Sequence, residues 1–398
     1  MSNNLMAYDF ETVYKRFNKG SHKWDELQEY GVNESENIIP FSVADLEFVT
    51  PPEIIAALKH ELDTNILGYS NATDEYLECV CDWFRTRHNW DAKPEWILPT
   101  HGVVDAFFEC VKTYTCEGDG VILTTPVYYP MYSAVKSNNR LLIESALLDM
   151  GDHYEIDFED LERKASQGNA KLLILCSPHN PCARVWTRDE LTRIGEICLR
   201  NNILVISDEI HCDLIMPGYT HTVFASISDE FANNCVVCTS PSKSFNIAGL
   251  QTSNIFIPNE SLREKFLASL KRNNPNPKCN ILGYVACEAA YKHGAKWLEQ
   301  ALEIINANKN IICEFIRREI PEIKIYTLEG TFLLWLDFRG LGLSYHELER
   351  INHYDAKLFF DEGYMFGKSG ECFERWNLAC PTRYIHDALS RLKAAYKK

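Results

Sequence analysis

Four polar residues in the middle of the chain could do chemistry together: Lys243, Asp208, His211 and Asn180. Taken singly, each has a plain structural explanation. A lysine in a turn is usually a solvated charge, an aspartate can cap a helix, a histidine can be satisfied inside a core, and an asparagine between prolines can make a turn. What joins the four is their position, because each stands at or just after the end of an apolar run.

These apolar runs have the length and composition of buried strands, and helical stretches separate them. One such helix is predicted over about 188–200, where the capping box Thr187-x-x-Glu190 precedes an apolar face. The pattern predicts an α/β fold with a mostly parallel sheet covered by helices on both faces. Ligands bind at the carboxyl ends of the strands in such sheets, so we expect one site there. The predicted strands lie within residues 120–126, 171–178, 202–209, 235–240 and 253–258.

The length of 398 residues exceeds the size at which a single core stops growing, which predicts two domains. Beyond about residue 285 the pattern changes to a long helical stretch (about 295–319), two strands and a helix opened by the box Ser344-x-x-Glu347. This order predicts a smaller α+β domain. The predicted divisions are an N-terminal arm packing with the small domain (1–45), a large domain (46–285) and the small domain (286–398).

Composition and charge exclude several classes of protein. No apolar run reaches the roughly 18 residues of a membrane helix, and the N-terminus lacks the basic-then-apolar order of a signal peptide. A net charge of −16 repels phosphate backbones, which argues against nucleic-acid binding. We therefore expect a cytoplasmic protein that binds neither membranes nor nucleic acids.

The fifteen cysteines are odd in number and scattered along the chain. The pair Cys235-x-x-Cys238 lies in a predicted strand, where positions three apart point to opposite faces, and no second pair has zinc spacing. The pattern predicts reduced thiols and no metal site.

The four polar residues meet the main demands of pyridoxal 5′-phosphate. The aldehyde of this cofactor takes a lysine as a Schiff base, for which Lys243 is the candidate. Its ring nitrogen needs a buried carboxylate to stay protonated, and Asp208 could supply it. Asn180 and His211 could both reach the phenolate oxygen O3′.

Nearby residues could hold the rest of the cofactor. Tyr128 follows the run at 120–126 and could stack on the ring. The phosphate needs hydroxyl and N–H donors. Candidates for these donors are the hydroxyls of Ser240 and Ser242 and the backbone N–H groups of Val103 and Val104 at the start of a predicted helix.

The segments CSPHNPCARVW (176–186), ISDEIHCDLIM (206–216) and SPSKSFNIAGLQ (240–251) occur in an order and spacing that resemble one known family. They are similar to fold-type I pyridoxal-phosphate enzymes of the class I/II aminotransferase superfamily, and more narrowly to its cystathionine β-lyase (cysteine-S-conjugate β-lyase) branch, the MalY/PatB type. Supporting segments FSVADLEF (41–48) and ERWNLACP (374–381) extend the resemblance over nearly the whole chain.

The resemblance implies further roles. Arg375 matches an arginine that grips the substrate α-carboxylate, and Asn180 and the backbone of Ala44 match groups that help to hold it. Tyr69 matches a tyrosine that reaches the cofactor phosphate of the neighbouring subunit, which implies a homodimer with shared active sites. Two positions depart from the family pattern: Ala183 replaces a usual glycine, and Gln251 replaces the phosphate-binding arginine of many aminotransferases.

The implied activity is α,β-elimination on cystathionine or cysteine S-conjugates, giving a thiol, pyruvate and ammonia. One alternative is transamination, which uses the same residues. A second is a lyase that also binds another protein as a regulator.

Overall fold

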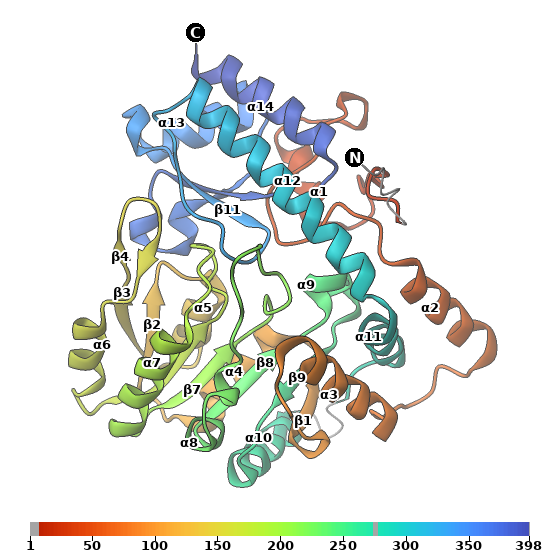
Figure 1. Cartoon of the computed structure of the whole chain (residues 1–398), viewed down its shortest axis with the longest axis vertical. Coiled ribbons are helices and arrows are strands. Elements are labelled where there is room, and N and C mark those ends of the chain that lie inside the picture. Colours follow the sequence, from red (N-terminus) through yellow and green to blue (C-terminus); the bar gives the residue numbers. More distant parts are fainter. Residues whose placement is uncertain (1–7, 274–277, 398) are drawn as a thin grey trace.

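The computed structural model describes residues 8–273 and 278–397. The described residues form a seven-stranded sheet, in the lower part of Figure 1, a four-stranded sheet around β11, in the upper part, and a two-stranded sheet of β4 and β5. The helix α12 spans Ala295–Glu319, as the sequence predicts, and descends from the small sheet towards α11.

The strands and helices have the following bounds. The strands are β1 Ile97–Thr100, β2 Gly120–Thr125, β3 Leu141–Ala146, β4 Leu148–Asp149, β5 Tyr154–Glu155, β6 Ala170–Cys176, β7 Leu204–Asp208, β8 Cys235–Thr239, β9 Ser253–Phe256, β10 Lys324–Ile325, β11 Leu333–Asp337, β12 Asp361–Glu362 and β13 Phe373–Asn377. The helices are α1 His22–Glu29, α2 Pro52–Thr64, α3 Asp74–His88, α4 Val103–Tyr114, α5 Tyr129–Ser137, α6 Phe158–Ala165, α7 Arg188–Arg200, α8 Asp229–Asn233, α9 Ser242–Phe245, α10 Glu260–Asn273, α11 Ile281–His293, α12, α13 Tyr345–Arg350 and α14 Thr382–Tyr396.

The large sheet has seven strands in the order β1-β9-β8-β7-β6-β2-β3. The neighbours from β8 to β3 pair in parallel, whereas β9 pairs antiparallel with both β8 and β1. The predicted α/β fold with a mostly parallel sheet is thus confirmed. Because β6, β7 and β8 are adjacent and parallel, their carboxyl ends meet at one edge of the sheet.

The small sheet is antiparallel, in the order β10-β11-β13-β12. The N-terminal arm contacts it, since the Phe41 N–H donates to Phe359 and the Phe41 ring packs against Trp376 at 5.4 Å between centroids. The domain limits at 45 and 285 remain a prediction. Residues 1–7 of the predicted arm and 274–277 of the predicted large domain lie outside the described residues.

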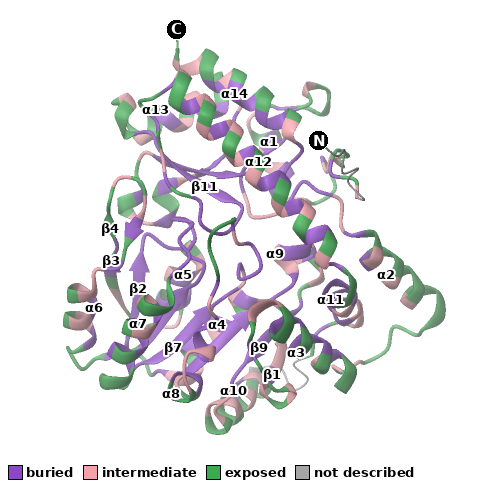
Figure 2. Cartoon of the chain, viewed as in Figure 1, coloured by how far each residue is buried: buried purple, intermediate pink, exposed green. Residues whose placement is uncertain are grey.

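Burial follows the sequence pattern. The strands β2, β6, β7 and β8 are buried almost throughout, and the exposed positions gather on the outer helices (Figure 2). Both predicted capping boxes form, at Thr187 with Glu190 and at Ser344 with Glu347. Across the described residues, no helix is long and apolar enough to cross a membrane.

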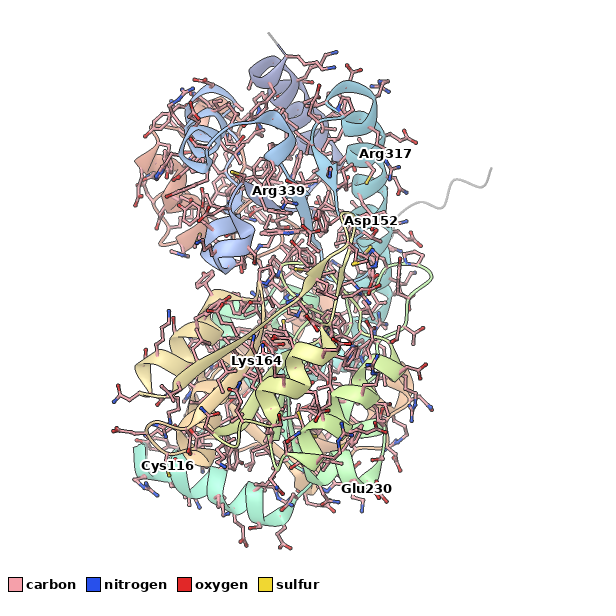
Figure 3. The ribbon with its side chains drawn as sticks, turned by 90° about the vertical axis from the view of Figure 1, so that its left-hand side faces the viewer. Cys116, Asp152, Lys164, Glu230, Arg317 and Arg339 are labelled. Carbon is pink, nitrogen blue, oxygen red and sulfur yellow. The ribbon has the colours of Figure 1, made fainter. Side chains whose placement is uncertain are left out.

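All fifteen cysteines lie among the described residues and are free. Most are buried. Cys116 is exposed and lies in the lower part of the view in Figure 3. The charged side chains of Glu230 and Arg317 are also exposed.

Gly283 lets helix α11 pack closely against the loop that follows α9. A Cβ atom there would lie 1.8 Å from Thr252 Oγ1 and 2.9 Å from the Leu250 carbonyl oxygen. We expect Gly283→Ala to lower the free energy of unfolding by about 1–3 kcal/mol, because overpacking forces the loop to shift. Urea denaturation measures this. Gly249→Ala is the control, since its Cβ would meet nothing within 4 Å; equal stability of the two variants would contradict the close packing.

Candidate active site

A cavity of about 290 Å³ lies at the carboxyl edge of the large sheet. It gathers residues from separate parts of the sequence, including strands or strand ends of both the seven-stranded and the four-stranded sheet. Of the residues singled out in the sequence, it is lined by Ala44, Val103, Val104, Tyr128, Asn180, Asp208, His211, Ser240, Ser242, Lys243 and Arg375. Tyr69, the remaining residue predicted to bind the cofactor, does not line this cavity. The strand-end rule points to residues 177–181, 208–211 and 240–243, and Asn180, Asp208 and Lys243 from these ranges line the cavity, while the chemical roles of all these residues remain predictions.

Lys243 lies on the short helix α9, and its Nζ donates a 2.9 Å hydrogen bond to the Ala44 carbonyl. Burial lowers the pKa of this amine, and the positive charges of Arg375 and Lys23 act in the same direction. Asp45 and Asp208 oppose the shift. A lysine with a lowered pKa is a better nucleophile and base at neutral pH than a solvated one.

A buried carboxylate that the sequence reasoning missed anchors α9. Asp213 accepts hydrogen bonds from Trp83 Nε1 (3.1 Å), His88 Nε2 (2.8 Å) and the hydroxyl of Ser244 (2.7 Å), the residue next to Lys243. These contacts keep the pKa of Asp213 low in spite of its burial. Its place in the segment DEIHCD, five residues after Asp208, is the only sequence signal that could have marked it.

Asp208 is the last residue of β7 and is 4% exposed. Burial raises its pKa to about 7, and the neighbouring Glu209 charge adds to this, while the Ile210 N–H and Lys243 act against it. The only hydrogen bond to its carboxylate among the described residues comes from the Ile210 N–H, at 3.2 Å. A cationic or N–H group of a ligand would therefore favour the charged form.

His211 and Asn180 flank Asp208 in the cavity. His211 is 3% exposed, its Nδ1 has no hydrogen-bond partner among the described residues, and burial lowers its pKa to about 3. It is therefore a neutral imidazole at physiological pH. The Asn180 side-chain oxygen accepts a 2.9 Å hydrogen bond from Arg375 Nη1, which ties the end of β6 to the small sheet.

Arg375 projects from β13 and is 2% exposed. Asp361 on the neighbouring β12, directly opposite in the ladder, accepts hydrogen bonds from Arg375 Nη2 (2.6 Å) and Nε (3.1 Å). The sequence reasoning did not find Asp361, because only the strand register reveals the pair. The paired carboxylate offsets the burial of the guanidinium and fixes the direction of its fork.

An anion could bind on the opposite side of the cavity. Helix α4 begins at Val103, and no side chain in the described part of the chain caps it, since Gly102 stands at the N-cap. Its first N–H groups are thus open to a ligand, as helix N-termini often are. The hydroxyls of Ser240 and Ser242 lie 3.0 Å apart on the cavity wall, and the buried Ser253 Oγ has no partner among the described residues.

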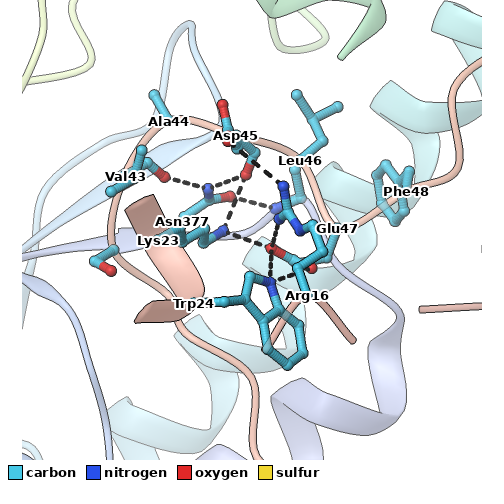
Figure 4. Close-up of polar contacts among 12 residues, drawn as sticks. Arg16, Lys23, Trp24, Val43, Ala44, Asp45, Leu46, Glu47, Phe48 and Asn377 are labelled. Carbon is cyan, nitrogen blue, oxygen red and sulfur yellow. Dashed lines mark hydrogen bonds and ion pairs between the residues drawn. The ribbon is translucent and has the colours of Figure 1, made fainter. Parts of the chain in front are cut away.

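Val43 and Ala44 line the cavity, and the polar contacts of the segment from Val43 to Glu47 are shown in Figure 4. Val43 has φ of 54°, a left-handed conformation that a β-branched residue rarely adopts. Asn377 holds it there by donating to the carbonyls of Val43 (2.7 Å) and Asp45 (2.8 Å). Such strain persists only where surrounding contacts enforce it.

Three further residues clarify the comparison with the family pattern. Tyr69 is 99% exposed on the segment between α2 and α3, which extends away from the body of the chain (Figure 1). Ala183 has φ of 58°, which explains why glycine suits this position. Gln251, also left-handed with φ of 47°, lines the cavity where many aminotransferases place arginine.

The sheet order and the position of the cavity define the fold of type I pyridoxal-phosphate enzymes. A family model described as aminotransferase class I and II matches residues 36–382, and the chain belongs to this family. The resemblance seen in the sequence is confirmed.

Individual relatives agree over nearly the full length. The chain is 42% identical to cystathionine beta-lyase PatB of Bacillus subtilis, over 97% of this chain and 99% of the relative. The crystal structure of cystalysin from Treponema denticola, which contains a pyridoxal 5′-phosphate cofactor, matches with a TM-score of 0.96 and 46% identity, covering 98% and 99% of the two chains. The pyridoxal-phosphate-bound C-S lyase of Staphylococcus hominis matches with a TM-score of 0.90 and 31% identity, over 98% of each chain.

The raised pKa of Asp208 predicts a pH-dependent stability of the cofactor-free protein. The native state binds a proton that the unfolded chain has released, so this carboxylate's contribution to stability is present below about pH 4 and is lost as the pH rises to about 7. We expect Asp208→Asn, which cannot titrate, to gain stability relative to the wild type across that window, on the order of a few kcal/mol. Urea unfolding at several pH values tests this, with the exposed Asp63→Asn as control. A pH-independent difference would refute the shift.

Proposed function

We propose that this protein is a pyridoxal-phosphate-dependent carbon–sulfur lyase that performs α,β-elimination on cystathionine or cysteine S-conjugates. The observation that carries the proposal is that the half-buried Lys243 and the buried Asp208 and Arg375 line one cavity. The names of the relatives support it, since one is a cystathionine beta-lyase and another a C-S lyase.

The cavity fits the cofactor on several observations. Asp208 would hold the ring nitrogen, because its buried carboxylate otherwise lacks a cationic hydrogen-bond donor. The neutral His211 and the amide of Asn180 would face the phenolate oxygen, and Tyr128 would cover the ring. The uncapped start of α4 and the hydroxyls of Ser240 and Ser242 would hold the phosphate. The structure of cystalysin, at 46% identity, contains this cofactor.

The side chains of the protein divide the reaction between them. When bound, pyridoxal phosphate supplies an electron sink for the carbanion at Cα. Arg375 binds the α-carboxylate of the substrate with its guanidinium fork, and Asn180 and the Ala44 backbone help to orient it. Lys243, with its lowered pKa, takes the Cα proton. The Cβ–S bond then breaks, the thiolate leaves with the electron pair, and the released aminoacrylate hydrolyses to pyruvate and ammonia.

Assembly as a homodimer is part of the proposal. Tyr69 is almost fully exposed in the single chain, as are Ile66 (86%) and, to a lesser degree, Leu67 (59%). Three large hydrophobic residues on one short segment favour contact with another protein surface. We infer that this segment reaches the active site of a neighbouring subunit, where Tyr69 would contact the cofactor phosphate. A cytoplasmic location accords with the free thiols.

The substrate test uses the full-length protein loaded with pyridoxal phosphate. Elimination needs a leaving group on Cβ, so we expect cystathionine to yield pyruvate and ammonia in equal amounts without any added 2-oxo acid. Alanine serves as the matched control because it has no leaving group, and it should give no ammonia under the same conditions. Pyruvate that appears only from alanine and only with a 2-oxo acid would identify an aminotransferase instead.

Arg375 gives a second test. Arg375→Lys keeps the charge beside Asp361 but loses the planar fork. We expect kcat/KM for cystathionine to fall by about 10–100-fold, since a charge-assisted hydrogen bond contributes about 1.5–3 kcal/mol. Arg339→Lys is the control, because Arg339 pairs with Asp337 on the same sheet but outside the cavity. Unchanged kinetics in Arg375→Lys would argue against its role in carboxylate binding.

A further inference from the structure

Lys23 on α1 is a buried lysine to which the reaction described above gives no task. Its side chain is only 1% exposed, although an ammonium group is among the most costly groups to bury. Its Nζ lies 3.1 Å from Glu47 Oε1 and donates a 3.0 Å hydrogen bond to the Asp45 carbonyl (Figure 4). Both contacts are made to the segment that directly follows Val43 and Ala44, the two residues of the arm that line the cavity.

Lys23 belongs to a cluster of charged side chains in which Lys23 and Glu47 are buried and Arg16 and Asp45 are partly exposed. Glu47, with its side chain 3% exposed, also accepts a 2.6 Å hydrogen bond from Arg16 and two 3.3 Å contacts from Trp24 Nε1. Arg16 in turn lies 3.6 Å from the Asp45 carboxylate. Two cations and two carboxylates thus form one cluster. The ion pair with Glu47 compensates the charge of Lys23, but it does not explain why the same Nζ also donates to the Asp45 carbonyl.

Three successive carbonyl groups explain what Lys23 does. The carbonyls of Val43 and Asp45 accept from Asn377, and that of Asp45 also accepts from Lys23. The carbonyl between them, of Ala44, accepts from Lys243. Fixing the peptide groups on either side fixes the direction of the middle one. The strained φ of Val43 means that the segment would relax without these contacts.

We propose that Lys23 is a positioning residue for Lys243, acting through the Asp45 carbonyl to aim the Ala44 carbonyl at the Lys243 amine. The inference rests on the proposed function, in which Lys243 carries the cofactor and moves the Cα proton. The Ala44 carbonyl gives the free Lys243 amine a fixed acceptor. The amine is thereby held in one place for proton transfer instead of sampling many rotamers.

Electrostatics support the same link. The positive charge of Lys23 is one cause of the lowered pKa of Lys243, after burial, and Arg375 acts in the same direction. Asp45 and Asp208 act in the opposite direction, and the fifth titratable group at the amine, His211, is neutral. Removing the charge of Lys23 should therefore make protonation of the Lys243 nitrogen easier.

The experiment compares Lys23→Met, Lys23→Arg and Lys15→Met in the full-length protein loaded with pyridoxal phosphate. Lys15 is the matched control because it lies on the same arm and also donates to a backbone carbonyl, that of Glu34, but not at the cavity. The readouts are the pH midpoint of the visible absorption band, borohydride labelling of the Lys243 peptide, and kcat against KM.

We expect Lys23→Met to raise the midpoint by about 0.3 pH unit or more and to lower kcat about tenfold with little change in KM, which is the pattern of a misplaced proton-transfer group. In Lys23→Arg the midpoint should lie close to that of the wild type, because the positive charge is kept. In Lys15→Met it should equal that of the wild type. Glu47→Gln, which strengthens the field of Lys23, should move the midpoint in the opposite direction. A purely structural role would give shifts of the same sign in Lys23→Met and Glu47→Gln.

Two results would overturn the inference in distinguishable ways. If the wild type shows the band and the Lys243 label, but Lys23→Met titrates like Lys15→Met, Lys23 has no positioning role and the proposed function stands. If the wild type shows no band and no label on Lys243, the proposed function fails and the inference fails with it. Should Lys23→Met not fold, Lys23→Arg and Glu47→Gln decide by the same midpoint.

Discussion

The burial of charge at one edge of the large sheet is the constraint on which the rest of the site depends. Asp208, Lys243 and Arg375 all line a cavity of about 290 Å³, where water cannot solvate them fully. Each charge is disfavoured there unless a fixed partner stands beside it. Arg375 has Asp361 within the chain. Within residues 8–273 and 278–397, Asp208 accepts only a 3.2 Å hydrogen bond from the Ile210 N–H, which leaves a buried carboxylate to be neutralised by a proton or by a cationic ligand.

Strand β13 of the small sheet carries one of these buried charges, Arg375, into the cavity. Successive side chains of a strand point to opposite faces, so Arg375 and its cross-strand neighbour Asp361 face the cavity while Glu374 and Glu362 face the other way. Asn352 donates to Glu374 at 3.1 Å, and burial with the nearby Glu362 charge raises the pKa of Glu374. The hydrogen bond from Arg375 to Asn180 then ties β13 to the end of β6.

Much of the site could be predicted from sequence because its parts follow a local rule. Apolar runs mark the strands, and in parallel strands the residues after each run must meet at one edge. Thus Asn180, Asp208 and Ser240 came together without any knowledge of long-range contacts. Capping boxes such as Thr187 with Glu190 are equally local, and the structure forms them as predicted.

The remainder depends on register and docking, which local patterns do not encode. The reversed direction of β9 is invisible in its apolar run, since parallel and antiparallel buried strands have similar composition. Asp361 becomes meaningful only once β12 lies beside β13. Asp213 looks like any acidic residue until Trp83, His88 and Ser244 converge on it.

The burial of Lys23 on the N-terminal arm is a further feature that local sequence patterns do not predict. In the sequence, Lys23 is one of forty basic residues, and a lysine on a short helix is expected to be solvated. In the structure it is almost wholly buried, 22 residues along the chain from the carbonyl to which it donates. Replacing both members of a buried ion pair by apolar residues is often neutral for stability, whereas removing one member leaves the other charge buried and unpaired. The pair with Glu47 therefore accounts for the charge of Lys23, and its second contact, to the Asp45 carbonyl, is the one through which we infer that Lys23 directs the backbone that Lys243 contacts.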